Sequence, residues 1–415
     1  MIKNLTILVL FLSTSFLGLK LMQAEGEAMP VNPSVSSSGS AAHVQGPSPS
    51  CPHGMKDYLP RKLGFTGAEL LNRIKESTTS SSSQKMRMSL GSLTANANSL
   101  FYDNFMKLVG PQFLGSCEQR VCAPERSTVS RLTKDVNVLK HVHSHNDYWR
   151  SLPLFEALSY GVSSVEADVW LVQNNTELAV GHNEGFLEAE VRNLETLYTG
   201  PLLSMLDEVN CHDWDSDEKY GVFYNSPETT LYLYIDFKSE DNIRTYDLLL
   251  TKYLKPLIDS GYLSYFDLET NSVIWNPITI VLTGDYPQNT TVLDHGNQDG
   301  YFHSMQRFAF LDAPLHKLDQ VDATLSVVAS CSLEQLLESC SFSDPYAQQS
   351  SELSREQLEC MWPTIKQAHE LNLKTRLWGV PDWPRYKRDN LWKQQLEYLQ
   401  MDFLNVDDLA AISKF

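Results

Sequence analysis

Residues 140–148 read KHVHSHNDY, and the fold can be worked out from this segment outward. The histidines His141, His143 and His145 occupy alternate positions and follow the apolar pair Val138 and Leu139. Alternate side chains of a β-strand lie on one face, so the pattern predicts a strand that directs several imidazoles toward one place.

Two later segments carry pairs of charged residues at spacing two. Glu166 and Asp168 lie in VSSVEADVWL, and Asp236 and Lys238 lie in LYLYIDFKS. Each pair comes at the end of an apolar, β-branched segment, which is where a parallel α/β barrel builds its active site. A further histidine, His182 in LAVGHN, follows the first pair. The sequence therefore predicts that these residues form one site.

The remainder of the chain has the rhythm of a TIM-type (β/α)8 barrel, in which strands alternate with segments of helical periodicity. The residues of Phe308–Leu311 compete with the sixth predicted strand. Helices are predicted at 154–160, 241–259 and 354–371, the last with a capping box. The eight predicted strands lie near residues 138–145, 163–170, 178–182, 231–238, 278–284, 324–329, 373–378 and 402–406.

We expect three regions along the 415 residues. Residues 1–24 combine a lysine, a short apolar run and small polar residues, which is typical of a cleaved secretory signal. An uncleaved membrane anchor is the alternative, since the apolar character continues to Met22. Residues 25–130 are a Ser-rich linker with short helical patches and are expected to be largely disordered. Residues 131–415 form the barrel.

The cysteine content agrees with a secreted or secretory-pathway protein. Seven cysteines are present, and the close pairs Cys117/Cys122 and Cys331/Cys340 are spaced to close small loops, although a sequence does not fix the pairing. An odd count leaves at least one thiol unpaired. Glycosylation sequons at Asn174 and Asn289 fit the same compartment.

The charge of the chain argues against nucleic acid as a partner. The formal net charge is −18, and no basic run is present that would follow a phosphate backbone. Oligomeric state does not follow from the sequence.

Three carboxylates that converge repel one another unless a cation lies between them. Glu166, Asp168 and Asp236 offer the hard oxygen ligands that Mg²⁺ or Ca²⁺ prefers. The alternative is a structural carboxylate–lysine network inside the barrel, with Asp236 and Lys238 as members. His145 and His182 each end a predicted strand, and two imidazoles beside one substrate can serve as general base and general acid.

The order His145, Glu166-x-Asp168, His182 resembles the pattern of glycerophosphodiester phosphodiesterases. Near the C-terminus, KTRLWGVPD and DFLNVDDL resemble the last two strands of that superfamily. The segments SHNDYWRSLPLFEALSYGVSSVEADVWL and LAVGHN are similar to the fungal altered inheritance of mitochondria protein 6 family, which belongs to the phospholipase C-like phosphodiesterases. The resemblance covers roughly residues 135–415.

This resemblance implies a metal-dependent phosphoric diester hydrolase acting on a glycerophosphodiester or phospholipid-type substrate. It makes His145 and His182 the acid/base pair, and it makes Glu166, Asp168 and Asp236 the metal ligands. It also places Lys238 on the phosphate.

Several features bear on the substrate. Trp378 is expected to form an apolar wall for an alcohol or lipid group, with ordinary packing as the alternative. Other aromatic residues near the same rim, among them Trp149, suit an amphiphilic ligand and peripheral contact with a membrane. Asn146-Asp147 departs from the Arg-Gly of glycerophosphodiesterases, and Arg150 is the candidate replacement for the missing arginine.

Two alternatives stay open. His143-x-His145 also resembles the first motif of zinc amidohydrolases, for which Asp407 would supply the last ligand, but no histidine ends the fifth predicted strand. A catalytically inactive secreted barrel that binds a ligand is the second alternative. Five convergent titratable groups have no evident use in an inactive protein.

Overall fold

The computed structural model describes residues 122, 124–212, 218–287, 292–293, 305–342 and 351–415. The predicted signal segment and nearly all of the predicted linker lie outside the described residues, as do Cys117 and the sequon at Asn289. The expectations for those segments stay predictions. None of the helices formed by the described residues has both the length and the apolar character needed to cross a bilayer.

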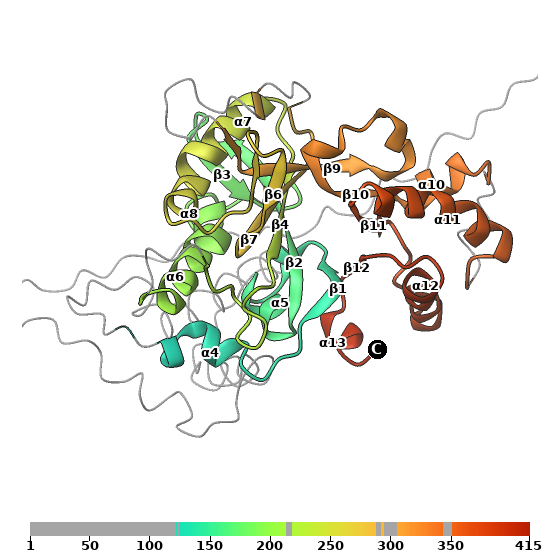
Figure 1. The fold of residues 1–415 in the computed structure, drawn as a ribbon, viewed down its shortest axis with the longest axis horizontal. Helices are drawn as coiled ribbons and strands as arrows, with labels where there is room; N and C mark the ends of the chain where they lie inside the picture. Colours follow the sequence, from blue (N-terminus) through green and yellow to red (C-terminus); the bar gives the residue numbers. More distant parts are fainter. Residues whose placement is uncertain (1–121, 123, 213–217, 288–291, 294–304, 343–350) are drawn as a thin grey trace, which may run out of the picture. The chain divides into compact units, whose positions relative to one another are not determined.

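Eight parallel strands form a closed barrel, which confirms the predicted fold class (Figure 1). Around the barrel they follow the order β1-β2-β4-β7-β9-β10-β11-β12, and β12 pairs with β1 to close it. The strands are β1 (Leu139–Ser144), β2 (Val162–Val172), β4 (Leu231–Phe237), β7 (Ile278–Gly284), β9 (Ala309–Pro314), β10 (Ser326–Ser332), β11 (Lys374–Trp378) and β12 (Phe403–Val406).

Helical segments connect the strands along the outside of the barrel. In Figure 1, α10 and α11 lie beside β10 and β11, the strands they flank in sequence. The α-helices are α4 (Thr128–Leu132), α5 (Phe155–Ser159), α6 (Gly200–Val209), α7 (Asn242–Leu248), α8 (Lys255–Asp259), α10 (Leu333–Ser339), α11 (Arg355–Glu370), α12 (Arg385–Glu397) and α13 (Leu409–Ile412). Shorter helical segments are η1 (Pro124–Arg126), η2 (Asp147–Trp149), η3 (Glu184–Phe186), η4 (Glu195–Thr199), η5 (Leu249–Leu254), η6 (Leu315–Gln320) and η7 (Ala323–Leu325).

Two strand predictions need correction. Residues near 178–182 form β3 (Glu177–Val180), which pairs antiparallel with β2 and lies outside the closed barrel. The barrel still has eight strands, because the two segments that compete for the sixth position in the sequence pattern are both strands. The segment near Phe308–Leu311 forms β9, and the segment near 324–329 forms β10. A small antiparallel sheet, β5 (Tyr265–Asp267), β6 (Ser272–Ile274) and β8 (Gln306–Arg307), was not predicted.

Alternation along β4 shows how sequence separates the inside of the barrel from the outside. Leu231, Leu233 and Ile235 belong to the larger apolar cluster that includes the surrounding helices. Tyr232 and Tyr234 belong to a smaller cluster formed by residues of β4, β7, β9, β10 and β12, together with Phe266 of β5. The period of two therefore directs Asp236 into the barrel as well, above the tyrosine layer.

The capping box predicted for the helix near 354–371 is confirmed. Ser354 and Gln357 form a capping box at the start of α11. Gly161 follows α5 with φ +81°, and a Cβ there would lie 2.0 Å from the backbone oxygen of Asn137. Only glycine fits this connection between α5 and β2.

The disulfides differ from the close pairs that the spacing favoured. Cys122 bonds to Cys211, and Cys340 bonds to Cys360, while Cys331 is a free, buried thiol. Cys331 lies on β10, whereas Cys340 follows α10, so the intervening helix separates the two thiols. Proximity in sequence was therefore a poor guide to pairing here.

Candidate active site

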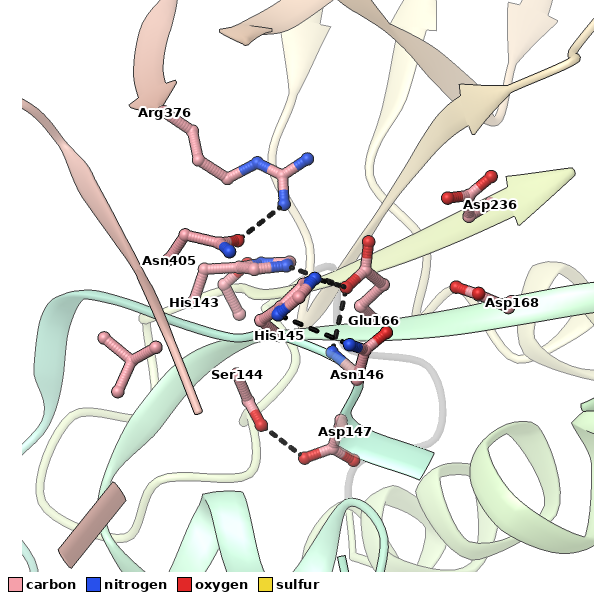
Figure 2. Close-up of polar contacts among 12 residues, drawn as sticks. His143, Ser144, His145, Asn146, Asp147, Glu166, Asp168, Asp236, Arg376 and Asn405 are labelled. Atoms are coloured by element: carbon pink, nitrogen blue, oxygen red, sulfur yellow. Dashed lines mark hydrogen bonds and ion pairs between the residues drawn. The ribbon is translucent and has the colours of Figure 1, made fainter. Parts of the chain in front are cut away.

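Neighbouring strands bring three carboxylates together at one end of the barrel. Glu166 and Asp168 lie on β2, and Asp236 lies on β4, in direct register with Asp168. One oxygen from each of the three residues lies within 4.8 Å of the others. Figure 2 shows these side chains on adjoining strands. The predicted acidic cluster thus exists as a geometric unit.

Two oxygens of this cluster lack partners. Asp168 Oδ1 and Asp236 Oδ1 are buried and make no hydrogen bond. Gly284, at the end of β7, has φ +72°, and a Cβ added there would lie 2.0 Å from Asp236 Oδ1. The glycine therefore leaves room for the carboxylate, and no predicted motif included it. Buried acceptors without donors are the arrangement expected of an oxygen-ligand cation site.

Lys238 follows β4 and partly neutralises the cluster. Its Nζ lies 2.8 Å from Asp236 Oδ2 and 3.3 Å from Asp168 Oδ2. The pKa of Asp168 is raised to about 7 by burial and by the charges of Glu166 and Asp236. Burial also raises the pKa of Asp236, against the lowering effect of Lys238. One ammonium group therefore does not balance three carboxylates.

Glu166 contacts a buried network of polar groups that includes Asn146 and His143. Its Oε2 accepts a hydrogen bond of 3.0 Å from the backbone N–H of Asn146 and lies 3.7 Å from His143 Nε2. Burial and the charge of Arg376 lower the pKa of His143 to about 4, so this ring is neutral near pH 7. Burial alone would raise the pKa of Glu166, but His143 and Arg376 hold it well below its usual range. Glu166 is therefore the permanently ionised member.

Arg376 is a buried cation that the sequence did not single out. It lies on β11, with its guanidinium 4.7 Å from the ring centroid of Tyr234. It donates hydrogen bonds to Asn405 (3.1 Å) and to Asp312 (3.4 Å). Figure 2 shows Arg376 reaching toward Asn405 and the imidazole of His143. This cation supports the acidic layer without belonging to it.

His145 lies beside Glu166 and is oriented by Asp407. Its Nδ1 lies 2.9 Å from Asp407 Oδ1, while its Nε2 faces Glu166 at 4.0 Å. Burial opposes protonation, but Asp407 and Glu166 outweigh it and raise the pKa of His145. From sequence alone, Asp407 is a candidate only for a zinc ligand. The Nδ1 atom of His143, by contrast, contacts Ser164 Oγ at 2.8 Å.

His182 lies on the other side of the cluster, beside Asp168. Its Nδ1 is 3.3 Å from Asp168 Oδ2 and 3.1 Å from the hydroxyl of Tyr148. The same hydroxyl donates to Asp168 Oδ2 at 2.8 Å. Tyr148 is fully buried, so its ring is not exposed at the rim of the barrel. It links the acidic cluster to His182.

The turn after His145 is structural. Asp147 is fully buried and accepts hydrogen bonds from Ser144 Oγ (2.6 Å) and the backbone N–H of Leu154 (2.6 Å). Arg150 bonds to Ser144, Asp147 and the backbone carbonyls of Val406 and Asp407. Protein oxygens thus engage Nε and both terminal nitrogens of its guanidinium, which supports a structural role for Arg150 in this turn. Its role as a replacement for the phosphate-binding arginine stays a prediction.

Two tryptophans border the site and face solvent. Trp378 ends β11 and is 42% exposed, so part of its indole is accessible from solvent. The ring centroid of Trp149 lies 5.0 Å from that of His182, and Trp149 is 56% exposed. The two tryptophans are thus accessible to a ligand.

The residues present fit a hard divalent cation better than zinc. The cluster offers carboxylate oxygens, two of them unsatisfied, and more negative than positive charge. In the described part of the chain, the only other set with metal-ligating atoms close together contains Cys122 and Cys211, which form a disulfide. His143 and His145 contribute to no such set there, so the amidohydrolase alternative lacks its ligands.

Comparison with known proteins gives the class. The model of the AIM6-like phosphodiesterase domain matches residues 130–303, the part of the chain that contains both histidines, Lys238 and all three carboxylates. The protein is therefore a TIM barrel of the phosphodiesterase type. No solved structure gave a significant match.

Curated relatives give the family. Altered inheritance of mitochondria protein 6 of Lachancea thermotolerans is 51% identical over 360 residues, which cover 85% of this chain and 82% of the relative. The proteins of that name from Saccharomyces cerevisiae strain YJM789 and Zygosaccharomyces rouxii are 47% and 44% identical, over 85% and 84% of this chain and 87% and 86% of their own. The chain belongs to the altered inheritance of mitochondria protein 6 family.

Proposed function

We propose that this protein is a metal-dependent phosphoric diester hydrolase that uses His145 and His182 as its acid/base pair. The observation that carries the proposal is the placement of the two imidazoles on either side of one carboxylate cluster. His145 approaches Glu166, and His182 approaches Asp168. A diester bound at the cluster would have one imidazole near each of its two ester oxygens.

Glu166, Asp168 and Asp236 would hold Mg²⁺ or Ca²⁺ through oxygen atoms. The bound cation would offset negative charge on the non-bridging phosphate oxygens. Lys238 would contribute a second positive charge to the phosphate, since its Nζ already lies beside two of the three carboxylates. The raised pKa values of Asp168 and Asp236 support this assignment, because cation binding would relieve the repulsion that raises them.

The two histidines would move the protons of the reaction. One imidazole would take a proton from an attacking water molecule as its oxygen bonds to phosphorus, and the other would protonate the alcohol oxygen as its bond to phosphorus breaks. Asp407 would hold the Nδ1 proton of His145, which leaves Nε2 directed at the cluster. Tyr148 would orient His182 through the contact at its Nδ1.

The substrate class that fits best is a glycerophosphodiester or phospholipid-type diester. Exposed Trp149 and Trp378 would offer apolar surface to its alcohol or lipid group and support peripheral contact with a membrane. The disulfides Cys122–Cys211 and Cys340–Cys360 support a location in the secretory pathway or outside the cell. The formal net charge of −18 supports the exclusion of nucleic acid.

Hydrolysis of bis(p-nitrophenyl) phosphate by the purified protein tests the proposal. Activity should disappear in EDTA and return with Mg²⁺ or Ca²⁺. The variants His145→Ala and Glu166→Gln should each lower kcat by about 100-fold or more, the scale of lost acid/base or metal assistance. His141→Ala is the matched control, because His141 lies on β1, just before His145, but is exposed and has its ring beside the backbone carbonyl of Asp402.

The outcomes separate this proposal from a binding protein without activity. Metal-dependent turnover that survives in His141→Ala and is lost in the other two variants supports a hydrolase. Turnover that both His145→Ala and Glu166→Gln retain would overturn the assignment of the site. Absence of turnover on this diester and on glycerophosphodiesters, with any divalent cation, would favour the inactive barrel.

A further inference from the structure

A cavity of about 420 Å³ opens directly beside His145. One wall is the segment that follows β11, from Gly379 to Trp383, and another is the first half of α12. Asn405 and Asp407, at the end of β12, form the third wall. The volume lies in the range of small-molecule sites in proteins. It is continuous with His145 but contains none of the three acidic residues of the cluster.

The inner wall of the cavity is formed by the buried side chains of Arg388 and Trp392 and by the carboxylate of Asp408, which are fixed by other contacts. Arg388 bonds to Asp389 at 2.8 Å and to Asp408 at 3.3 Å, and its guanidinium lies 4.5 Å from the ring centroid of Trp392. Asp408 also accepts a hydrogen bond from the backbone of α13. Donors and acceptors in this wall are therefore held in place before any ligand binds.

The part of the lining that faces solvent, here called the outer wall, is more open. It consists of Asp382, Trp383 and Arg385, and the indole of Trp383 is 72% exposed. Acidic and basic groups alternate with an aromatic face along this wall. A ligand entering from solvent would meet this indole and these charges before it reached His145.

The mixture of charges selects against several ligands. Three aspartates line the cavity, and their negative charges would repel a second phosphate group. Two arginines also line it, and their positive charges would repel a quaternary ammonium group. Its polar walls are unsuited to a long acyl chain, which would leave these groups without partners. A hydroxyl group is uncharged and can both donate and accept, so it suits both kinds of wall. The flat face of a sugar or cyclic polyol would suit the indole of Trp383.

We infer that this cavity binds a sugar or cyclic polyol carried as one alcohol component of the diester. This inference rests on the proposed function and adds the identity of one ester arm and its place. The opposite side of the site is different, since His182 is bordered by Trp149 and is followed in sequence by Phe186, which is 65% exposed. The hydroxylated arm therefore lies on the His145 side.

Binding rather than turnover provides the test. Isothermal titration calorimetry with the full chain and Mg²⁺ would compare myo-inositol 1-phosphate and glucose 1-phosphate with ethyl phosphate and phosphocholine. Each cyclic ester should bind at least about ten-fold more tightly than ethyl phosphate, as one or two added hydrogen bonds allow. Phosphocholine should show no such advantage.

Two variants locate the effect. Trp383→Ala and Arg385→Met should each weaken the cyclic esters by about five-fold or more and leave ethyl phosphate unchanged. Trp275→Ala is the matched control, because Trp275 is also an exposed tryptophan but precedes β7 at the other end of the barrel. It should change none of the four affinities.

The result that overturns the inference is independent of catalysis. Equal affinities for cyclic esters and ethyl phosphate, no binding of any ester, or an advantage that survives both variants would each exclude this subsite. Absence of bis(p-nitrophenyl) phosphate hydrolysis alongside selective binding of the cyclic esters would instead refute the hydrolase and retain the subsite.

Discussion

Replacing Asp168 with asparagine should stabilise the metal-free protein, although it removes a proposed metal ligand. Burial and the charges of Glu166 and Asp236 raise the pKa of Asp168 to about 7 from a value of 3.8. Since this carboxyl binds its proton more tightly in the folded chain, the fold loses stability as pH rises between the two values. The cost is complete above about pH 7 and nearly absent below about pH 4.

The size of the effect follows from this pKa shift. A rise of about three pKa units, at about 1.4 kcal/mol each, corresponds to about 4 kcal/mol. That figure is an upper limit, because asparagine also gives up the ion pair between Asp168 and Lys238. We expect a net increase of about 1–2 kcal/mol in the free energy of unfolding at pH 8, or about 3–5 °C in Tm.

Thermal unfolding in EDTA at pH 5 and pH 8 provides the assay, repeated with Mg²⁺ or Ca²⁺. The advantage of Asp168→Asn should be clear at pH 8 and smaller at pH 5. Added cation should stabilise the wild type and have little effect on the variant. Asp259→Asn is the control, because its carboxylate forms an exposed ion pair with Lys255 on α8. An Asp168→Asn protein less stable than wild type in EDTA at pH 8 would refute the repulsion argument.

Three further substitutions test other parts of the site. Gly284→Ala should abolish cation-dependent stabilisation and activity, because its Cβ would collide with Asp236 Oδ1, whereas Gly185→Ala, with no atom within 4 Å, should be neutral in both assays. Asp407→Asn should lower kcat by about 10–100-fold and move the limb of the pH–rate profile that belongs to His145 to lower pH, since Asp407 raises the pKa of that imidazole; an unmoved limb would contradict this. Tyr148→Phe should cost about 1–2 kcal/mol in thermal unfolding, because the lost hydroxyl bonds to Asp168 and Asn146; an unchanged Tm would show that these bonds are dispensable.

The barrel could be predicted because its strands carry a strict period of two. In β4, the same alternation that buries Leu233 and Ile235 on the outside directs Asp236 inward. The errors came from connections. The short segment Glu177–Val180 can be recognised as a strand from its sequence, but the strand it pairs with cannot. The connection between β9 and β10 contains η6 and η7 but no α-helix. Without a helix between them, the two segments are predicted from sequence as alternatives for a single strand.

The acidic residues were predictable for the same reason, but their partners were not. Asp407 is 262 residues from His145 in sequence and reaches it because β1 and β12 close the barrel. The register that pairs Ser144 with Val406 places the next residue of each strand side by side. Sequence alone fixes neither this register nor the packing that buries Tyr148 beside Asp168.

The two histidines are positioned by different structural devices, and this difference has a consequence for substitutions. His145 follows β1, and its backbone N–H donates to Val406, so closure of the barrel holds it. His182 follows β3, where the backbone N–H of Gly181 donates to the backbone carbonyl of Asp168 and the indole N–H of Trp170 donates to the backbone carbonyl of Gly181. A change that loosens this hairpin should therefore displace His182 while leaving the carboxylate cluster on β2 and β4 in place. Such a variant should lose hydrolytic activity but still be stabilised by the divalent cation as much as the wild type in thermal unfolding.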